Sequence, residues 1–338
     1  MPELRKDPII GRWIIIATER GKRPSDFIVD RNHVRGGFCP LCPGNENTTP
    51  PEVLAYAPPG RHANQPGWQL RVVPNKYPAL VIEGEIGKEG EGLYDKMNGI
   101  GAHEVIIETP DHNESFTHLP LERMTQVFMA YRERLVDLGK DDRFRYVMLF
   151  KNYGAAAGAS LEHSHSQLIA LPILPRMITS ELEGSLSYYR YKERCVFCDI
   201  IRQELDQDVR LVTQNEKFIA IVPFAPRSPF EMWVIPKRHA SSYVDADGET
   251  LKSLAAIFSE CMRRLDSCLP NVPYNFVLHT APLRSSSLEH YHWHFEITPK
   301  LTMIAGFEWG SGFYINPVAP EEAAKFLRNA DLTEQPKP

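Results

Sequence analysis

The chain has 338 residues, of which 43% are hydrophobic, 24% charged and 10% aromatic, and its formal net charge is −5. This composition is typical of a soluble globular protein and excludes disordered and fibrous classes. The negative charge gives no general attraction to nucleic acid or to an anionic membrane, so neither is expected as a partner. The length is sufficient for two domains.

Two further features of the composition bear on the cellular compartment. No apolar run approaches the roughly 20 residues of a membrane span, and the opening MPELRKDPII lacks the apolar core of a signal peptide. We therefore expect a cytoplasmic protein. Four of the six cysteines form two CxxC pairs, which in a reducing compartment indicates metal or redox chemistry. Cys261 and Cys268 share the apolar face of a predicted helix and are interpreted as core residues.

In chain order, the predicted elements are short strands with one long helix in each half. The first half is expected to contain strands at 12–18, 104–108, 146–152 and 166–171, with a helix at 121–138. The second half repeats this with strands at 217–223, 231–236, 275–280 and 293–298, and a helix at 251–268. Segments 41–67 and 84–101 are interpreted as loops, and the pattern is interrupted over 172–194. We predict an α+β fold with largely antiparallel sheets.

A cysteine–histidine pattern occurs twice in the same order. The first copy comprises Cys39, Cys42, His112, His163 and His165, and the second comprises Cys195, Cys198, His239, His290 and His292. The lone His precedes the first His of the pair by 51 residues in both copies (163 − 112 and 290 − 239). A constant order and offset (127, from 239 − 112 and 290 − 163) indicates a duplicated unit. We therefore expect an N-terminal domain over 1–175 and a partly degenerate second copy over 190–332.

Each copy offers two thiols and two imidazoles, which are ligands that tetrahedral zinc prefers in closed structural sites. A single CxxC would fit a redox couple about as well, but the duplicated histidines favour a metal. We expect one zinc site formed by Cys39, Cys42, His112 and His163. A second is expected at Cys195, Cys198, His239 and His290, where His290 is chosen among several histidines because it holds the matched position.

The segment after the first copy's small-residue loop carries a candidate nucleophile. Alternate residues of a strand share a face, so His163, His165 and Gln167 point the same way. With His163 on the metal, His165 would face a cleft, where a neutral imidazole can attack phosphorus. Gln167 can donate to a phosphoryl oxygen, and the loop at 152–160 offers backbone N–H groups and the Ser160 hydroxyl. Taken alone, an HxH pair fits a second metal ligand or a core histidine about as well as it fits a catalytic role.

The stretch from Asn152 to Gln167, with its S-x-x-H-x-H-x-Q core, resembles the active-site strand of the galactose-1-phosphate uridylyltransferase family. That family belongs to the histidine-triad (HIT) superfamily, so the resemblance implies tandem HIT-like domains. The resemblance extends over nearly the whole chain and includes 5–13, 20–24, 39–42, 73–78, 111–112 and 306–308.

The resemblance implies a ping-pong transfer of UMP between UDP-glucose and galactose 1-phosphate through a covalent uridylyl-His165. A nucleotide sugar and a hexose 1-phosphate would be the substrates, and the family generally acts as a homodimer. The further roles that it implies are Gln167 and Ser160 on the transferred phosphoryl group, Arg20 and Arg23 near phosphates, Asn75 and Asn152 at the nucleotide, and Phe307 and Glu308 at the sugar.

Some residues look closer to a divergent branch that includes ADP-glucose phosphorylase-like members. Ser164 stands between the paired histidines, where the best-known uridylyltransferases have proline. The second CxxC and the ending 312–317 also look closer to that branch, which leaves the base and the acceptor open. The best-known members have a different second metal site, whose residues match His279, His292 and His294, with Glu181 available as the fourth ligand.

Two other classes of function fit parts of the sequence. A HIT-type nucleotide hydrolase is supported by His290, His292 and His294, the complete HxHxH of the second copy. Hydrolysis would form product with water alone, whereas a transferase needs an added sugar phosphate. A zinc-stabilised binding module without activity would form no covalent nucleotidyl-protein.

Overall fold

The computed structural model describes residues 1–20, 27, 37–285 and 287–333. Its centre is a ten-stranded sheet of antiparallel neighbours in the order β10-β11-β12-β14-β13-β8-β9-β7-β4-β3. The first half supplies β3 (Leu54–Tyr56), β4 (Leu70–Pro74), β7 (Ala102–Ile107), β8 (Tyr146–Tyr153) and β9 (His165–Leu171). The second half supplies β10 (Leu211–Gln214), β11 (Phe218–Ile221), β12 (Met232–Pro236), β13 (Tyr274–His279) and β14 (His294–Pro299).

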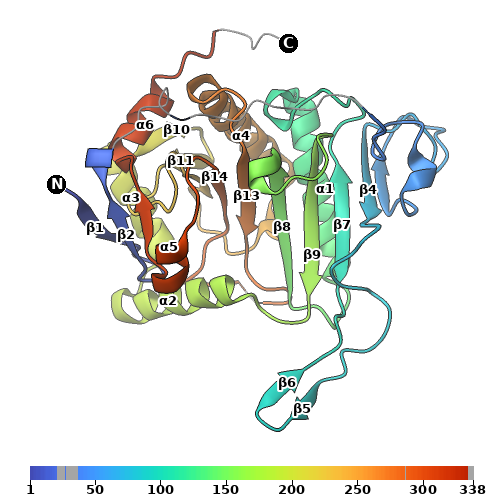
Figure 1. Ribbon diagram of the computed structural model, residues 1–338, viewed down its shortest axis with the longest axis horizontal. Coiled ribbons are helices and arrows are strands. Elements are labelled where there is room, and N and C mark those ends of the chain that lie inside the picture. The colour runs from blue at the N-terminus through green and yellow to red at the C-terminus, as the bar shows by residue number, and fades with distance from the viewer. Residues whose placement is uncertain (21–26, 28–36, 286, 334–338) are drawn as a thin grey trace.

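The two halves are joined in the middle of this sheet, where β13 pairs with β8 and Asn275 lies opposite Asn152. Helices α1 (Leu121–Leu138) and α4 (Gly248–Cys268) pack side by side against one face, which confirms the two predicted helices (Figure 1). Their phenylalanines meet between the copies, with the rings of Phe128 and Phe258 5.3 Å apart. The hydrophobic core is therefore continuous across both copies.

Two helices that the sequence did not predict cover the other face of the second half. Helix α2 (Arg176–Lys192) occupies the segment expected to interrupt the pattern, and α3 (Val196–Gln207) begins at the second CxxC. Helix α2 buries only Ile178, Glu181 and Ser185, so its apolar stripe is too weak to be recognised by periodicity. Among the described residues, the same face of the first half carries a small apolar cluster around Cys39 and Trp68.

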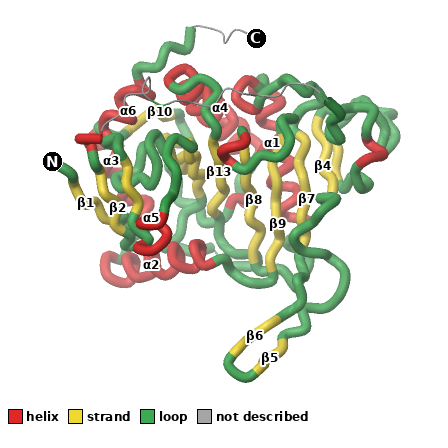
Figure 2. Tube along the Cα trace, viewed as in Figure 1, coloured by secondary structure: helices red, strands yellow, loops and turns green. Residues whose placement is uncertain are grey.

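The remaining elements lie around the large sheet. A three-stranded sheet joins both ends of the chain through β1 (Glu3–Lys6), β2 (Trp13–Ile16) and β15 (Tyr314–Asn316). The hairpin β5 (Glu89–Glu91) and β6 (Tyr94–Lys96) projects from the body of the molecule (Figure 2). The other helices of the described residues are α5 (Gly306–Ser311), α6 (Pro320–Arg328) and the 3₁₀ turns η1 (Thr18–Arg20), η3 (Glu46–Thr48), η4 (Phe116–His118), η5 (Ala155–Ala157) and η6 (Tyr243–Asp245). Within the described part of the chain, no helix combines the length and apolarity needed to cross a membrane.

Candidate active site and metal centres

The first predicted metal group is brought together beside β9. Ligand atoms of Cys39, Cys42, His112 and His163 all lie within 4.8 Å of one another. Cys42 Sγ is 3.4 Å from His112 Nδ1 and 3.5 Å from His163 Nδ1. A zinc tetrahedron with bonds of about 2.3 Å to sulfur and about 2.0 Å to nitrogen has S···N edges of about 3.5 Å, so these residues fit the metal.

The second group forms as well, but with a different histidine. Cys195, Cys198, His239 and His292 lie together, with Cys198 Sγ 3.4 Å from His239 Nδ1 and 3.8 Å from His292 Nδ1. The expected ligand His290 is corrected to His292. The ring of His290 instead lies beside Tyr189, and only its backbone carbonyl faces Cys195.

Each metal group has an equivalent supporting hydrogen bond from a histidine to a backbone carbonyl. The positions of these carbonyls show why His292, and not His290, is the ligand. His163 Nε2 lies 2.7 Å from the carbonyl of Thr109, and His292 Nε2 lies 2.8 Å from that of Pro236. The copies are therefore offset by 127 at these carbonyls (236 − 109) but by 129 at the histidines (292 − 163). The sequence Ser-Leu-Glu-His occurs in both copies at an offset of 127, but in the second copy the ligand histidine lies two residues further along the chain. In both groups the carbonyl accepts from Nε2–H and leaves Nδ1 free to bind a metal.

His165, the first residue of β9, has the geometry of a nucleophile. Its Nδ1 lies 2.7 Å from the backbone carbonyl of His163 and must donate to it, which leaves Nε2 with an unshared pair. Burial and the nearby Lys151 ammonium lower the pKa of His165, so its ring is neutral near pH 7. His165 borders a cavity of about 310 Å³, which is also lined by Asn152 and Ser160.

A buried ion pair that the sequence analysis missed lies beneath this strand. Lys151 Nζ is 2.6 Å from Glu108 Oε2 and 2.8 Å from the carbonyl of His165. Both side chains are almost fully buried, and Tyr131 also donates to Glu108. Through the hydrogen bond from Lys151 to the carbonyl of His165, the ion pair holds the backbone at the nucleophile in place. A lysine in the apolar run of β8 was the available sequence signal.

Two glycines of the loop at 152–160 occupy positions with a positive φ angle. Gly154 and Gly158 have φ values of 81° and 88°, a region that favours glycine. Asn275 of the second half holds this loop, because its Nδ2 donates to Asn152 Oδ1 at 2.8 Å and to the Ala157 carbonyl at 2.9 Å. Ser160 is exposed at the end of the loop.

The remaining predicted substrate contacts differ in where they lie. Gln167 and Asn75 both contact His103, on the face of the sheet that carries His165. Phe307 and Glu308 lie on α5 in the second half and are not among the described residues that line the cavity. Arg23 and the side chain of Arg20 lie outside the described residues.

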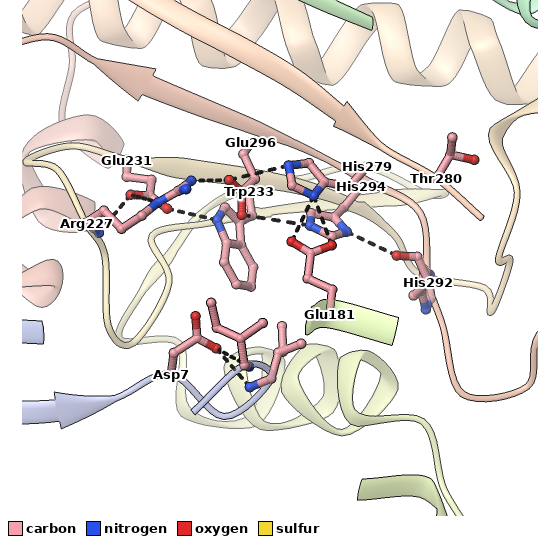
Figure 3. A network of polar contacts seen from close by, with 12 residues as sticks. Asp7, Glu181, Arg227, Glu231, Trp233, His279, Thr280, His292, His294 and Glu296 are labelled. Carbon is pink, nitrogen blue, oxygen red and sulfur yellow. Dashed lines mark hydrogen bonds and ion pairs between the residues drawn. The ribbon is translucent and has the colours of Figure 1, made fainter. Parts of the chain in front are cut away.

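The face of the second half that corresponds to the cavity is filled by a charged cluster (Figure 3). Its members are Glu181, Arg227, Glu231, His279, His294 and Glu296. Glu181 Oε1 is 2.9 Å from His279 Nδ1, and Arg227 pairs with Glu296. Burial lowers the pKa of His279, but Glu181 and Glu296 outweigh it and raise that pKa to about 9.

His294, the counterpart of His165, is enclosed within this cluster. Its side chain is 1% exposed, and the cavity beside it has a volume of only about 10 Å³. Burial and the neighbouring His279 lower the pKa of His294 to about 4. Asp7, Ile9 and helix α2 close this side. No substrate of the size of a nucleotide can reach His294 in this arrangement.

Comparisons with known proteins match nearly the whole chain. The models of the N-terminal and C-terminal domains of galactose-1-phosphate uridyl transferase match residues 1–175 and 181–329. ADP-glucose phosphorylase of Arabidopsis thaliana is 35% identical over 98% of this chain and 94% of that protein. Galactose-1-phosphate uridylyltransferase of Thermotoga maritima is 30% identical over 98% of this chain and 99% of that protein.

Solved structures give the same result. The crystal structure of an ADP-glucose phosphorylase from Arabidopsis thaliana with bound ADP-glucose has a TM-score of 0.84 and 34% identity, covering 98% of this chain and 100% of that one. A uridylyltransferase structure has a TM-score of 0.76 and 30% identity, covering 98% of each chain.

Proposed function

The chain belongs to the galactose-1-phosphate uridylyltransferase family, and on that premise we propose that it transfers a nucleotidyl group from a nucleotide sugar through a covalent nucleotidyl-His165. The unprotonated Nε2 of His165 beside an open cavity is the observation that carries this proposal. Residues 1–175 would form the catalytic domain and 190–332 the degenerate copy.

The chemistry has two steps. His165 Nε2 attacks the α-phosphorus, the bond from that phosphorus to the bridging oxygen breaks, and the sugar 1-phosphate leaves. A phosphate oxygen of the acceptor then attacks the same phosphorus and releases His165. The amide of Gln167 and the hydroxyl of Ser160 would donate to the transferred phosphoryl group, which develops charge in both transition states. The backbone N–H groups of loop 152–160 would assist.

Two donors are candidates. We propose ADP-glucose with inorganic phosphate as acceptor, because the similarity to an ADP-glucose phosphorylase, at 35% identity and a TM-score of 0.84, exceeds that to the two uridylyltransferases compared above, at 30% identity and a TM-score of 0.76. The products would be ADP and glucose 1-phosphate. UMP transfer from UDP-glucose to galactose 1-phosphate, expected from the sequence, is the second candidate and is favoured by the 30% identical relative.

Both thiol–imidazole groups are proposed to bind Zn²⁺. Four protein ligands close each site, so the metal would stabilise the fold and leave no position for substrate. The first would hold the segment before β9 through His163, two residues from the nucleophile. A homodimer is also proposed, because the exposed Phe307 and Trp309 on α5 lie away from the cavity of their own chain.

Labelling with α-³²P nucleotide sugars tests the proposal. The purified protein is incubated with labelled ADP-glucose and, separately, with labelled UDP-glucose. We expect acid-labile label on the protein from the preferred donor and none in His165→Ala. Release of the label by phosphate or by galactose 1-phosphate then identifies the acceptor. Absence of label from both donors in metal-loaded protein would contradict the transferase and favour a hydrolase or a binding protein.

A further inference from the structure

The amide of Gln167, which lies two residues beyond His165 on the same face of β9, can be turned in two ways, and only one of them serves phosphoryl transfer. Its Nε2H₂ group donates hydrogen bonds, whereas its Oε1 would repel a phosphoryl oxygen. We propose that His103 is a positioning residue that holds Oε1 and thereby turns the NH₂ group of Gln167 toward the transferred phosphoryl group. This inference rests on the proposed function.

The register of the sheet brings the two side chains together. Gln167 on β9 lies opposite Val105 on β7, and His103 is two residues from Val105 on the same strand. Because alternate residues of a strand share a face, His103, Gln167 and His165 lie on one face of the sheet. The nitrogen Nε2 of His103 is 2.9 Å from Oε1 of Gln167.

A backbone group determines the direction of this hydrogen bond. The N–H of Ala79 donates to His103 Nδ1 at 3.1 Å, and a backbone N–H cannot accept. Nδ1 is therefore unprotonated, and the neutral ring carries its hydrogen on Nε2. His103 must then donate to Gln167, which requires the carbonyl oxygen of the amide to face it.

A third contact agrees less well with this arrangement. Nδ2 of Asn75 lies 3.2 Å from the same Nε2, and both atoms carry hydrogens in the proposed tautomer. The opposite tautomer would instead place Nδ1–H against the N–H of Ala79, whose direction is fixed by the backbone. The Asn75 amide can adjust, although its Oδ1 accepts from Tyr77 N–H at 2.9 Å. We therefore assign the hydrogen to Nε2.

With its oxygen held in this way, the amide of Gln167 keeps both hydrogens for substrate. Within the described part of the chain, no protein atom accepts from Gln167 Nε2. His103 contributes no proton to the reaction. Instead, His103 selects one of the two orientations of the Gln167 amide, which differ only in the exchange of Oε1 and Nε2, before the substrate binds.

Two substitutions of similar size and no charge separate positioning from packing. His103→Gln retains an acceptor for Ala79 and a donor for Gln167, whereas His103→Met has no donor for Gln167 and only a weak sulfur acceptor for Ala79. The readout is the single-turnover rate of His165 labelling from the preferred α-³²P nucleotide sugar, with substrate affinity measured separately. We expect the Gln variant to remain within about threefold of the parent, and the Met variant to be slower by about 10- to 100-fold with little change in affinity.

The same two substitutions in a Gln167→Met background provide the control. Without the amide there is nothing to orient, so their rates should agree within about twofold. Equal rates in the parent background, or an undiminished difference in the Gln167→Met background, would overturn the inference. Absence of label in the parent protein would instead contradict the proposed function.

The tautomer can be measured without activity. In protein labelled with ¹⁵N-histidine, the signals of His103 are identified by their loss in His103→Gln. We expect a bare Nδ1 and a protonated Nε2 near neutral pH. A hydrogen on Nδ1 would overturn the inference even if the enzyme is active.

Discussion

The two halves of this molecule repeat one backbone frame and differ in what covers it. His165 and His294 both begin a strand, and each directs Nδ1 to the carbonyl of a metal-group histidine two residues earlier, at 2.7 and 3.0 Å. The first faces a cavity of about 310 Å³, and the second a space of about 10 Å³.

The next positions along the strands also differ. Gln167 corresponds to Glu296 (offset 129). In the register of the sheet His103 corresponds to Glu231, because Val105 lies opposite Gln167 and Trp233 lies opposite Glu296, each two residues further along the chain. A neutral amide oriented by an imidazole is thus replaced by a carboxylate paired with Arg227. Duplication preserved the metal group and the strand, whereas the groups that would handle a phosphate occur in the first half alone. The repeated backbone and metal group therefore do not by themselves determine which half can carry out phosphoryl transfer.

Separate substitutions of the two strand histidines, His165 and His294, should give the largest difference between the two halves. We expect His165→Ala to lower nucleotidyl transfer by at least about a thousandfold, because the nucleophile is lost. His294→Gln should leave the rate within about threefold. Steady-state rates with the preferred donor measure both, and thermal unfolding shows that each variant is folded. Equal losses would mean that the buried histidine takes part in the chemistry.

Removing one metal at a time should give an intermediate effect. Cys39→Ser and Cys195→Ser should each lower the zinc content from two ions per chain to one, as measured by mass spectrometry. We expect Cys39→Ser to slow transfer by about 10- to 100-fold, because the segment that carries His163 loses its anchor beside His165. Cys195→Ser should lower thermal stability with little change in rate. A parent protein without zinc, or equal rate losses, would contradict this expectation.

The charged cluster should produce the smallest effect on catalysis and a distinct pH dependence of stability. The pKa of His279 is raised to about 9 in the folded protein, above its ordinary value of 6.5. Its stabilising contribution is therefore complete below about pH 6.5 and is lost as the pH rises through 9. The free energy of unfolding should fall by about 2 kcal/mol between pH 7 and 9.

Urea unfolding at several pH values measures this slope, and His279→Gln should remove it. The transfer rate at pH 7 should stay within about threefold in that variant. Identical slopes in the two proteins would show that His279 is not protonated in the folded state.

Local patterns were sufficient to predict the frame of the molecule. Apolar periodicity located α1 and α4, and the alternation of residues in β9 placed His165 and Gln167 on one face. The first thiol–imidazole group followed from ligand chemistry. These features depend on residues near in sequence, or on a duplicated order.

The remaining features depend on contacts that sequence spacing does not encode. His290 was preferred over His292 because four matching letters concealed a shift of two residues. His103 reaches Gln167 only through the pairing of β7 with β9, and Lys151 reaches Glu108 only through the burial of both. Helix α2 was missed because few of its residues are apolar.

The pairing of β8 with β13 has a consequence for synthesis on the ribosome. Strand β8, at the edge of the first half, is synthesised long before its partner in the second half, since the start of β13 comes 121 positions after the end of β8 (274 − 153). At roughly 5–20 residues per second, that interval lasts about 6 to 24 seconds. Through it the nascent chain presents an unpaired strand edge and half of a core, a surface prone to aggregation and suited to chaperone binding.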